Sequence, residues 1–402
     1  MKKFEKILLA LFVLAIPFQA RFVLFRWTMP FNEWTAGFLW ATDILFVILL
    51  IFNFQFSIFK KNRFLILFLA IAAISILQAD LVSVAIYRFI KLAEYSAFFF
   101  FFRQQKILSL PAIAAVWVGS CIFQALIGIV QYVLQHEVGF SILGESVLNP
   151  YGTAVAVVPA AGRLFLRAYG TTPHPNVLAA ILMIGLWAAL WLYFTQNKHR
   201  SLALGAYAII LIAFLLTFSR VAIVFWILAT LVMLMIFWIR QKRKDFWAPL
   251  ILTVVIGITF ASVLWPQVQS RLSIHAEDEA VAQRVFYAKL AGQATRGHLV
   301  QGIGIGQFVP DLMKSLPHYP AFIYQPAHSM YLLVVDEMGV PGFLAFLIFL
   351  GVWFVAQRTN PYVIVGMAAF LALGVFDHFF WTLQQGGLVF WGLLGILDSD
   401  II

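Results

Sequence analysis

The first segment able to do chemistry contains a histidine and a serine, in the run PAHSMYLLVVDEMGVPG at residues 326–342. Helical spacing relates four of its residues, which are His328, Tyr331, Leu332 and Val335. This pattern predicts a short helix with these side chains on one face. The GVPG sequence at 339–342 should end that helix, because proline lacks an amide hydrogen and glycine permits positive φ. The imidazole of His328 would then lie at the start of the helix, either as a general base or in a structural role.

Arginines are the second group of residues able to do chemistry. Arg220 follows Ser219 as the only strongly polar interruption of the apolar run 201–239. An ionisable residue in such a run is a functional candidate by default. Guanidinium groups bind pyrophosphate and phosphate oxygens through paired hydrogen bonds, so we expect Arg220, Arg167 and Arg284 to contact an anionic ligand. Contact with lipid headgroups is the alternative for each of them.

A glycine-rich stretch, GIGIG at 302–306, is too short for the dinucleotide-binding pattern and has no strand before it. A tight backbone turn that admits an anion or a sugar is the functional interpretation, and a plain loop turn is the alternative. The histidines lack the spacing of zinc ligands, so we expect no transition metal and no cofactor. Nothing in the pattern supports a divalent ion bridged by Glu277, Asp278 or Glu279.

Three charged residues, Arg88, Lys91 and Glu94, fall within another apolar segment and share a helical face. Lys91 and Glu94 can form an internal ion pair, and Asp43 could be a further partner. A structural polar seam is the favoured interpretation, with a substrate path along it as the alternative.

Helices that cross a membrane must position these residues. Of the 402 residues, 63% are hydrophobic and 11% charged, whereas soluble domains average about 25% charged residues. A soluble enzyme and a disordered chain are therefore excluded, and an all-α polytopic membrane protein is predicted. Runs of about 20 apolar residues give twelve expected spans, which are 5–25, 36–57, 63–79, 82–102, 107–134, 175–195, 201–218, 221–239, 247–266, 338–356, 361–379 and 381–397.

The basic residues predict how these spans are oriented. With both termini cytoplasmic, every inside loop carries Lys or Arg, fifteen of the 27 in total, in agreement with the positive-inside rule. A tight hairpin at Ser219-Arg220 is needed for this alternation. The largest external segment is then 267–337, before the tenth span, within a single membrane domain over 1–402. Ten further basic residues, eight of them Arg, lie on the outer side, which indicates an anionic ligand there.

Four motifs in register resemble the family of O-antigen ligases and Wzy-type O-antigen polymerases. They are His328-Ser329 with nine residues before Gly339-x-x-Gly342, R-x-x-G-T-x-x-H-P-N at Arg167–Asn176, T-x-S-R at Thr217–Arg220, and Arg284 followed by G-x-G-x-G-x-F at Gly302–Phe308. The resemblance covers residues 150–345 by motif and the whole chain by topology. His-Ser replaces the commoner His-Asn, within the set that the family permits.

This resemblance implies a metal-independent glycosyltransferase at the outer face of the bacterial inner membrane. It would transfer a glycan from undecaprenyl pyrophosphate to an acceptor hydroxyl, with glycolipid or glycan as acceptor and no nucleic acid involved. Arg220 and Arg284 would bind the pyrophosphate, and His328 would activate the acceptor hydroxyl. Single displacement would invert the anomeric centre, whereas double displacement would use Asp336 or Glu337 as nucleophile. Further substrate-binding candidates are Arg167, Asn176, Gly302, Gly304, Gly306, Ser329, Tyr331 and Glu337.

Other functions remain open at this point. The motifs do not separate a ligase from a polymerase or from an enzyme that glycosylates proteins. A flippase of lipid-linked sugars is the alternative of another class, although the chain has no internal repeat of the kind that transporters show, and a non-catalytic assembly scaffold is a third. The segment Asp377–Gly386 could shape the acceptor pocket or form a hairpin with a polar tip.

Overall fold

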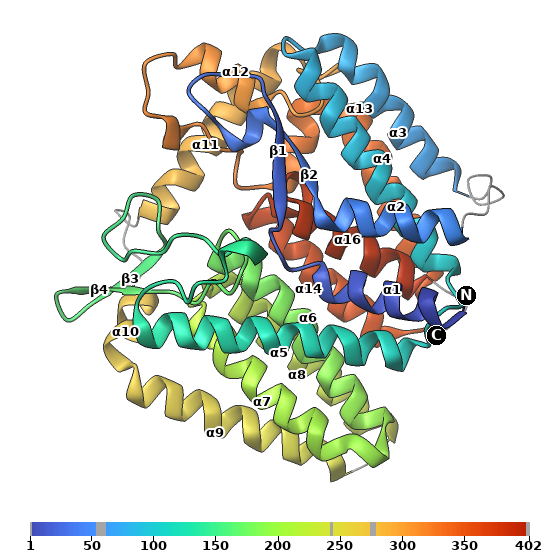
Figure 1. Cartoon of the computed structure of the whole chain (residues 1–402), viewed down its shortest axis with the longest axis vertical. Helices are drawn as coiled ribbons and strands as arrows, with labels where there is room; N and C mark the ends of the chain where they lie inside the picture. The colour runs from blue at the N-terminus through green and yellow to red at the C-terminus, as the bar shows by residue number, and fades with distance from the viewer. Residues whose placement is uncertain (1, 54–61, 242–243, 274–278, 399–402) are drawn as a thin grey trace. The chain divides into compact units, whose positions relative to one another are not determined.

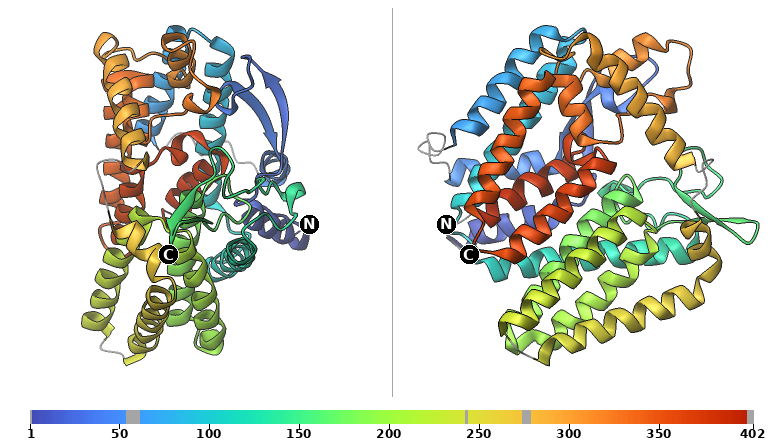
Figure 2. Two further views of the ribbon diagram at one scale, coloured as in Figure 1. Left: turned by 90° about the vertical axis from the view of Figure 1, so that its left-hand side faces the viewer. Right: turned by 180° about the vertical axis from the view of Figure 1, so that it is seen from behind.

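The computed structural model describes residues 2–53, 62–241, 244–273 and 279–398. The chain divides into two compact units, each assembled from three stretches of sequence. Unit 1 comprises Met1–Ala20, Lys106–His275 and Pro361–Leu373, and unit 2 comprises Arg21–Gln105, Ala276–Asn360 and Gly374–Ile402. Figures 1 and 2 show the ribbon of both units from three sides.

Unit 1 is built mainly from apolar helices. Its helices are α1 (Lys2–Ala15), α5 (Leu110–Leu134), α6 (Pro175–Thr195), α7 (Arg200–Leu216), α8 (Arg220–Gln241), α9 (Trp247–Val263), α10 (Trp265–Leu272) and most of α14 (Pro361–Phe376). Helices α5, α6 and α7 pack against one another, and α1 packs on α5 (Figure 1). A hairpin of β3 (Val157–Ala160) and β4 (Arg163–Leu166) extends the loop between α5 and α6.

Unit 2 combines helices with a hairpin of β1 (Arg21–Arg26) and β2 (Ala36–Trp40), which Figure 2 shows as a two-stranded ribbon. Its helices are α2 (Ala41–Asn53), α3 (Arg63–Ser75), α4 (Val82–Gln104), α11 (Glu279–Gly297), α12 (Phe308–Ser315), α13 (Met330–Ala356), the end of α14, α15 (Phe379–Thr382) and α16 (Gln384–Leu397). The 3-10 turn η1 (Glu33–Thr35) precedes β2. Helix α4 packs on α16, and α3 and α11 both pack on α13.

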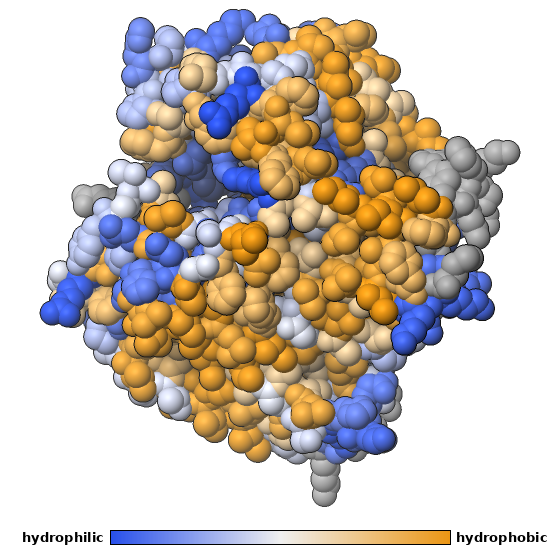
Figure 3. Space-filling view, viewed as in Figure 1, coloured by the Kyte–Doolittle hydropathy of each residue, from blue (hydrophilic) through white to orange (hydrophobic). Residues whose placement is uncertain are grey.

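The helices fit the predicted membrane character. Five helices in the described ranges are long and apolar enough to cross a membrane, and α9 with α10 forms a sixth candidate that bends by 94°. Each expected span contains an α-helix within the described residues, and the number of actual crossings stays a prediction. In the view of Figure 3, hydrophobic side chains cover α5 in unit 1 and α3 and α4 in unit 2, as lipid-facing helices require.

The first two expected spans are wrong where they meet. Helix α1 ends at Ala15 instead of continuing to residue 25, and α2 begins at Ala41 rather than at residue 36. Pro17 explains the early end, because the residue before a proline is pushed out of the helical region. The following RFVLFR sequence is rich in aromatic and β-branched residues, which favour strands. The two short hairpins add strands that were not expected, but the structure stays consistent with the predicted all-α class.

Helix α13 is broken at Gly339, where φ is 67° and ψ is −179°. The carbonyl groups of Asp336 and Glu337 therefore lack intrahelical partners: the break removes Val340 as donor to Asp336, and Pro341 has no amide hydrogen to donate to Glu337. The amide groups of Ile303 and Gly304 donate to these carbonyls at 2.8 and 3.0 Å. The amide of Val340 donates in turn to Leu299 at 2.8 Å. The glycine-rich loop and the broken helix therefore satisfy each other's backbone groups.

This contact requires glycine on both sides. Gly302, Gly304 and Gly306 all have positive φ. A Cβ on Gly302 would lie 2.5 Å from the backbone of Glu337, and one on Gly339 would lie 2.3 Å from the carbonyl oxygen of Val300. The prediction that 302–306 forms a tight turn is confirmed. The expectation that the helix would end at Gly339 is wrong, because only Gly339 leaves the helical conformation and α13 continues to Ala356.

Candidate functional site

Two of the sequence motifs meet in unit 1. The turn at Thr217–Ser219 joins α7 to α8, as the predicted hairpin requires. The Arg167 side chain, 6% exposed, donates through Nε to the Thr217 carbonyl oxygen at 2.6 Å and through Nη2 to Asn176 Oδ1 at 2.9 Å. Arg167 therefore ties the turn to the start of α6.

The start of α6 is held by the residues of the same motif. His174 is the N-cap, and its Nδ1 accepts a hydrogen bond from the amide of Asn176 at 3.1 Å. Pro175 occupies the first helical position, where its missing amide hydrogen costs nothing. Asn176 is thereby fixed with its side-chain oxygen toward Arg167.

Arg220 is the first residue of α8 and is half-buried. Its Nη1 lies 3.5 Å from the carbonyl oxygen of Arg271, and Arg271 Nη2 lies 3.4 Å from the carbonyl oxygen of Phe218. Arg167, Arg220 and Arg271 thus gather around one turn. The N-terminus of a helix is itself the positive end of its dipole, so the arginines and the helix end together create a strongly positive potential.

His328 lies in unit 2 two residues before the first residue of α13, close to its predicted place at the start of the helix. Helix α13 begins at Met330, with Ser329 as N-cap: the Ser329 hydroxyl oxygen accepts a hydrogen bond from the Leu332 amide at 3.4 Å. The amide of Met330 donates to the carbonyl of Asp377 at 3.1 Å. This ties the start of α13 to the segment after α14.

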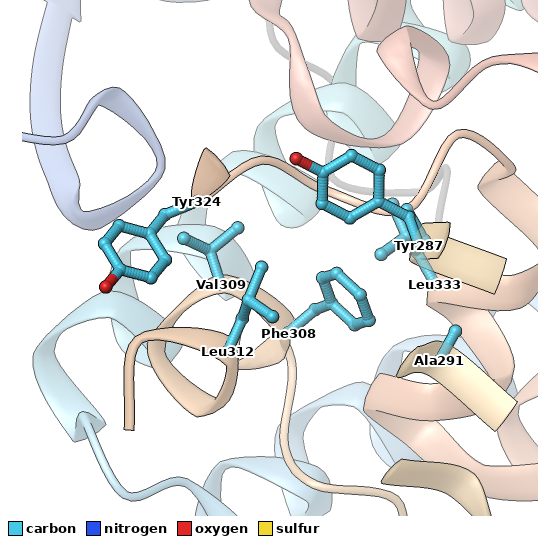
Figure 4. Close-up of a cluster of buried hydrophobic side chains, with 8 residues drawn as sticks. Tyr287, Ala291, Phe308, Val309, Leu312, Tyr324 and Leu333 are labelled. Atoms are coloured by element: carbon cyan, nitrogen blue, oxygen red, sulfur yellow. The ribbon is translucent and has the colours of Figure 1, made fainter. Parts of the chain in front are cut away.

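A hydrophobic cluster positions this end of α13. Tyr287 and Ala291 from α11 pack with Phe308 from α12 and Leu333 from α13 (Figure 4). The Tyr287 hydroxyl donates to the carbonyl of Ile323 at 2.6 Å, which fixes the loop before His328. Burial raises the pKa of Tyr287 to about 12, so its hydroxyl stays protonated as a donor.

Two aromatic side chains contact the His328 ring: Tyr287 with 5.4 Å between ring centroids, and His378 with 5.5 Å in a T-shaped arrangement. Burial lowers the pKa of His328 below 6.5; Asp377 opposes this shift, and the positive charge of Arg284 adds to it. His328 Nδ1 is buried and has no hydrogen-bond partner among the described residues. A neutral imidazole in this place has the protonation state of a general base.

Arg284, on α11, comes close enough to influence His328 electrostatically, and its Nε donates to the Phe376 carbonyl at 3.3 Å. Two of the three predicted catalytic residues therefore lie in one neighbourhood of unit 2. The third, Arg220, lies in unit 1 together with Arg167 and Asn176.

Sequence reasoning assigned no definite role to Asp377 and His378. His378 is buried, its Nδ1 is 2.6 Å from the Thr382 hydroxyl, and its ring also contacts Trp34. In the sequence, the only indication of a role for these two residues is that a polar pair follows an apolar segment. Their proximity to His328 is seen only in the fold.

The other predicted site residues of unit 2 lie around α13. Glu337 is 3% exposed and accepts a hydrogen bond from Trp381 Nε1 at 2.8 Å and others from the backbone amides of Gly306 and Phe308. Tyr331 is half-buried beside Phe343. Asp336 is 1% exposed and accepts a hydrogen bond from the Thr295 hydroxyl. Whether Ser329, Tyr331 or the three glycines contact substrate stays a prediction.

Among the described residues, no group of three His, Cys, Asp or Glu side chains could hold a metal ion. Glu277 and Asp278 lie outside the described residues, as does the side chain of Glu279.

The polar seam of α4 is confirmed as an ion-paired cluster: Lys91 Nζ is 2.9 Å from Asp43 Oδ1 and also contacts Glu94.

Comparison with known protein families gives a match to part of the chain. Residues 205–347, less than half of the chain, match the family model described as O-antigen ligase. This region includes the Thr217–Arg220 turn, Arg284, the glycine-rich loop and His328. A search of curated proteins found no match. Residues 205–347 are therefore similar to the O-antigen ligase family, the same family that the motifs of the sequence resemble.

Proposed function

We propose that this protein is a membrane glycosyltransferase that moves a glycan from undecaprenyl pyrophosphate to an acceptor hydroxyl. The observation that carries the proposal is the environment of His328. Burial and Arg284 keep its imidazole neutral, and His378 and Tyr287 hold the ring on two sides. The similarity of residues 205–347 to the O-antigen ligase family supports the same reaction class.

In this reaction His328 accepts the proton of the acceptor hydroxyl while the hydroxyl oxygen attacks the anomeric carbon. A bond forms between that oxygen and the carbon, and the bond from the carbon to the phosphate oxygen breaks. The electron pair of the broken bond leaves with the pyrophosphate, and Arg284 stabilises the developing charge. The configuration of the anomeric carbon is inverted.

The arginines around the 217–220 turn contribute charge of the same kind. Arg220 and Arg271 act together with the N-terminus of α8 on anionic groups of the donor. Arg167 keeps the turn in place through its bonds to Thr217 and Asn176. Pyrophosphate is already a good leaving group, so charge stabilisation and positioning account for most of the catalysis.

A double displacement has less support. Asp336 is 1% exposed, and its carboxylate already accepts the Thr295 hydroxyl. Glu337 is held by Trp381 and by two backbone amides. A nucleophilic carboxylate must be able to reach the anomeric carbon, and both side chains are almost fully buried.

Purified protein in liposomes tests the proposal. The liposomes receive undecaprenyl-pyrophosphate-linked glycan from the producing cell, together with lipid A–core, a second lipid-linked repeat or a serine-containing protein as acceptor. A glycosylated product that requires His328 supports the transferase, and the acceptor used separates ligase, polymerase and protein glycosylation. Movement of the donor between leaflets with no product from any acceptor would instead identify a flippase.

We further propose twelve crossings, both termini in the cytoplasm and the site on the outer face of the inner membrane. Cysteines introduced one at a time at Lys106 and Lys314, in a Cys121→Ala background, test this topology. A maleimide that does not cross the membrane should label position 314 in intact spheroplasts and position 106 only after lysis. The reverse pattern would contradict the orientation.

A further inference from the structure

The hairpin of β1 and β2 carries an apolar surface that the proposed reaction does not use. Phe22 and Leu24 are 71% and 51% exposed, and Val23 and Phe25 are 43% and 57% exposed. Phe22 and Val23 point to opposite faces of the strand, so both faces of β1 are apolar and exposed. Met29, in the loop between the strands, is 83% exposed. Apolar patches of this kind mark contact with a membrane or with another protein.

The second strand fixes the hairpin on the rest of unit 2. The Phe38 amide donates to the hydroxyl oxygen of Tyr87 on α4 at 3.2 Å, and that hydroxyl is also 3.2 Å from the Phe38 carbonyl oxygen. The Asn32 side chain donates to the Tyr324 carbonyl at 3.0 Å. Residues of β2 are mostly buried, whereas those of β1 are mostly exposed. The hairpin is therefore held in place with β1 turned away from the helices.

The direction of the hairpin places it along a membrane surface. Strand β2 ends at Trp40 and α2 begins at Ala41, so no linker separates the two elements. Figure 1 shows the hairpin running across the direction of α2 instead of continuing it. Helix α2 is the described part of the second predicted span, 36–57. A strand pair that crosses the direction of a spanning helix at its first residue lies along the bilayer surface.

The outer edge of β1 limits how deep the hairpin can lie. Within the described residues β1 pairs with β2 alone, so the backbone groups along its other edge have no strand partner. Such groups are not tolerated against hydrocarbon, whereas headgroups and water can bond to them. Interfacial segments bury their apolar side chains about 5–10 Å into the boundary between headgroups and acyl chains. This depth suits both the apolar side chains and the polar edge of β1.

A strand from another protein fits β1 less well. The register of the two strands shifts between Val23 and Phe25, and such an irregularity disturbs the regular ladder that an added strand needs. An added strand would also cover only the edge of β1 and leave Phe22 and Val23 exposed on its two faces. Lipid can cover the edge and both faces together.

Arg26 provides a charge for lipid headgroups. It is exposed at the end of β1, and no carboxylate of the described residues forms an ion pair with it. Arg21, at the other end of the strand, is paired with Glu33. A guanidinium binds phosphate oxygens through charge-assisted hydrogen bonds, and anionic leaflets attract basic residues near their surface. The hairpin thus combines apolar side chains with a cation, as membrane-surface segments do.

We propose that the β1–β2 hairpin is a membrane-binding arm: β1 and the loop at Met29 insert into the boundary between headgroups and acyl chains, and Arg26 contacts the phosphate of anionic phospholipid. Membrane binding by this arm does not depend on the reaction proposed above. Trp34 of the same hairpin contacts His378, which contacts His328. The arm therefore also holds the neighbourhood of His328 near the lipid surface.

Nitroxide labels on the full-length protein in nanodiscs of phosphatidylcholine and phosphatidylglycerol measure the depth of the arm. Single cysteines replace Leu24, Val47 on the exposed face of α2, or Lys314 on α12, in a Cys121→Ala background. Oxygen concentrates among acyl chains and a soluble nickel chelate in water, so the ratio of their collision rates with the label reports depth. The ratio should be highest at position 47, lowest at 314, and several-fold higher at 24 than at 314.

Two results of this measurement would overturn the proposal. A ratio at position 24 equal to that at 314 would show that the arm lies in water. Loss of collisions with both reagents at position 24 would show that a protein, such as a second copy of this chain, covers β1.

Removal of apolar side chains separates membrane binding from a position that the fold alone imposes. With the label at Met29, Phe22→Ser together with Leu24→Ser should lower the ratio to the value at position 314. Val147→Ser, at an exposed apolar residue between α5 and α6, is the control and should leave it unchanged. An unchanged ratio in a double variant that unfolds at the wild-type temperature would contradict insertion.

Lipid composition tests the role of Arg26. The ratio at position 29 should be higher with phosphatidylglycerol than in pure phosphatidylcholine, because the anionic headgroup attracts the guanidinium. Arg26→Gln should abolish this difference. A difference that persists in Arg26→Gln, or that is missing in the protein with Arg26, would overturn the assignment of this residue to anionic phospholipid.

Discussion

The turn at 217–220 in unit 1 and the neighbourhood of His328 in unit 2 differ in charge. The turn is strongly positive, whereas the His328 neighbourhood favours an uncharged side chain. The turn gathers three guanidinium groups at the positive end of a helix, held by bonds to backbone carbonyls. The His328 neighbourhood removes the His328 imidazole from water and so favours its neutral form. The first can hold negative charge at any physiological pH, because arginine stays protonated. The second can move protons. One enzyme that expels an anion and activates a hydroxyl needs both.

The largest expected effect is the loss of the proton acceptor. His328→Ala should lower the rate of glycan transfer about 10³-fold, as removal of a general base typically does, when initial rates are measured in donor-containing liposomes. His318→Ala, at an exposed loop histidine, should keep the wild-type rate. Equal rates for the two variants would leave the His328 neighbourhood without a catalytic role.

Removal of positive charge at the turn should have the next largest effect. Arg220→Gln should lower the same rate about 10²-fold, because one stabilising group for the anion is lost. Arg163→Gln, at an exposed position of β4, is the control in the same unit and should be neutral. If Arg163→Gln lowered the rate as much as Arg220→Gln, general surface charge rather than the turn would bind the donor.

The backbone that supports His328 can be tested without touching a charge. Gly339→Ala forces a residue with a Cβ into φ of 67° and against the Val300 carbonyl, which should cost about 1–3 kcal/mol. Thermal unfolding in detergent should show the lower stability. Gly351→Ala is the control in the same helix, since nothing lies within 4 Å of its Cβ position, and its melting temperature should not fall.

The smallest effect concerns pH and should be specific to unit 2. In the folded protein burial lowers the pKa of His328 below its ordinary value of 6.5, so the unfolded chain binds more protons at pH values just below 6.5. Stability should therefore be complete above about pH 6.5 and fall as the pH drops below it. His328→Gln should weaken this dependence of the melting temperature on pH. Arg220→Gln should leave its shape unchanged; if it did not, the contrast between the two regions would fail.

Hydropathy located the helices well because each span must satisfy its backbone internally. Helix α6 begins and ends at the predicted residues 175 and 195, and the hairpin before Arg220 is where charge alternation required it. Hydropathy could not separate the strand at 21–26 from the end of a span, since short apolar runs suit both structures. Pro17 was the residue that indicated an early end of the first helix.

The candidate site was only partly accessible from sequence. The motifs identified Arg167, Arg220, Arg284 and His328 as a set of residues, but not the bond from Arg167 to Thr217. The proximity of Asp377 and His378 to His328 depends on packing between segments about 50 residues apart. The spacing of residues in a sequence predicts which side chains share a face of one helix or strand. It does not predict contacts between distant segments.

The break in α13 also bears on how the protein is made. Residues 299–304 leave the ribosome before the helix that they complete, so the amides of Ile303 and Gly304 exist when the carbonyls of Asp336 and Glu337 first need partners. A chain with the reverse order would have to hold two unsatisfied carbonyls until synthesis of the missing loop. Because the loop precedes the helix in the sequence, the nascent chain need not expose these two carbonyl groups without hydrogen-bond donors.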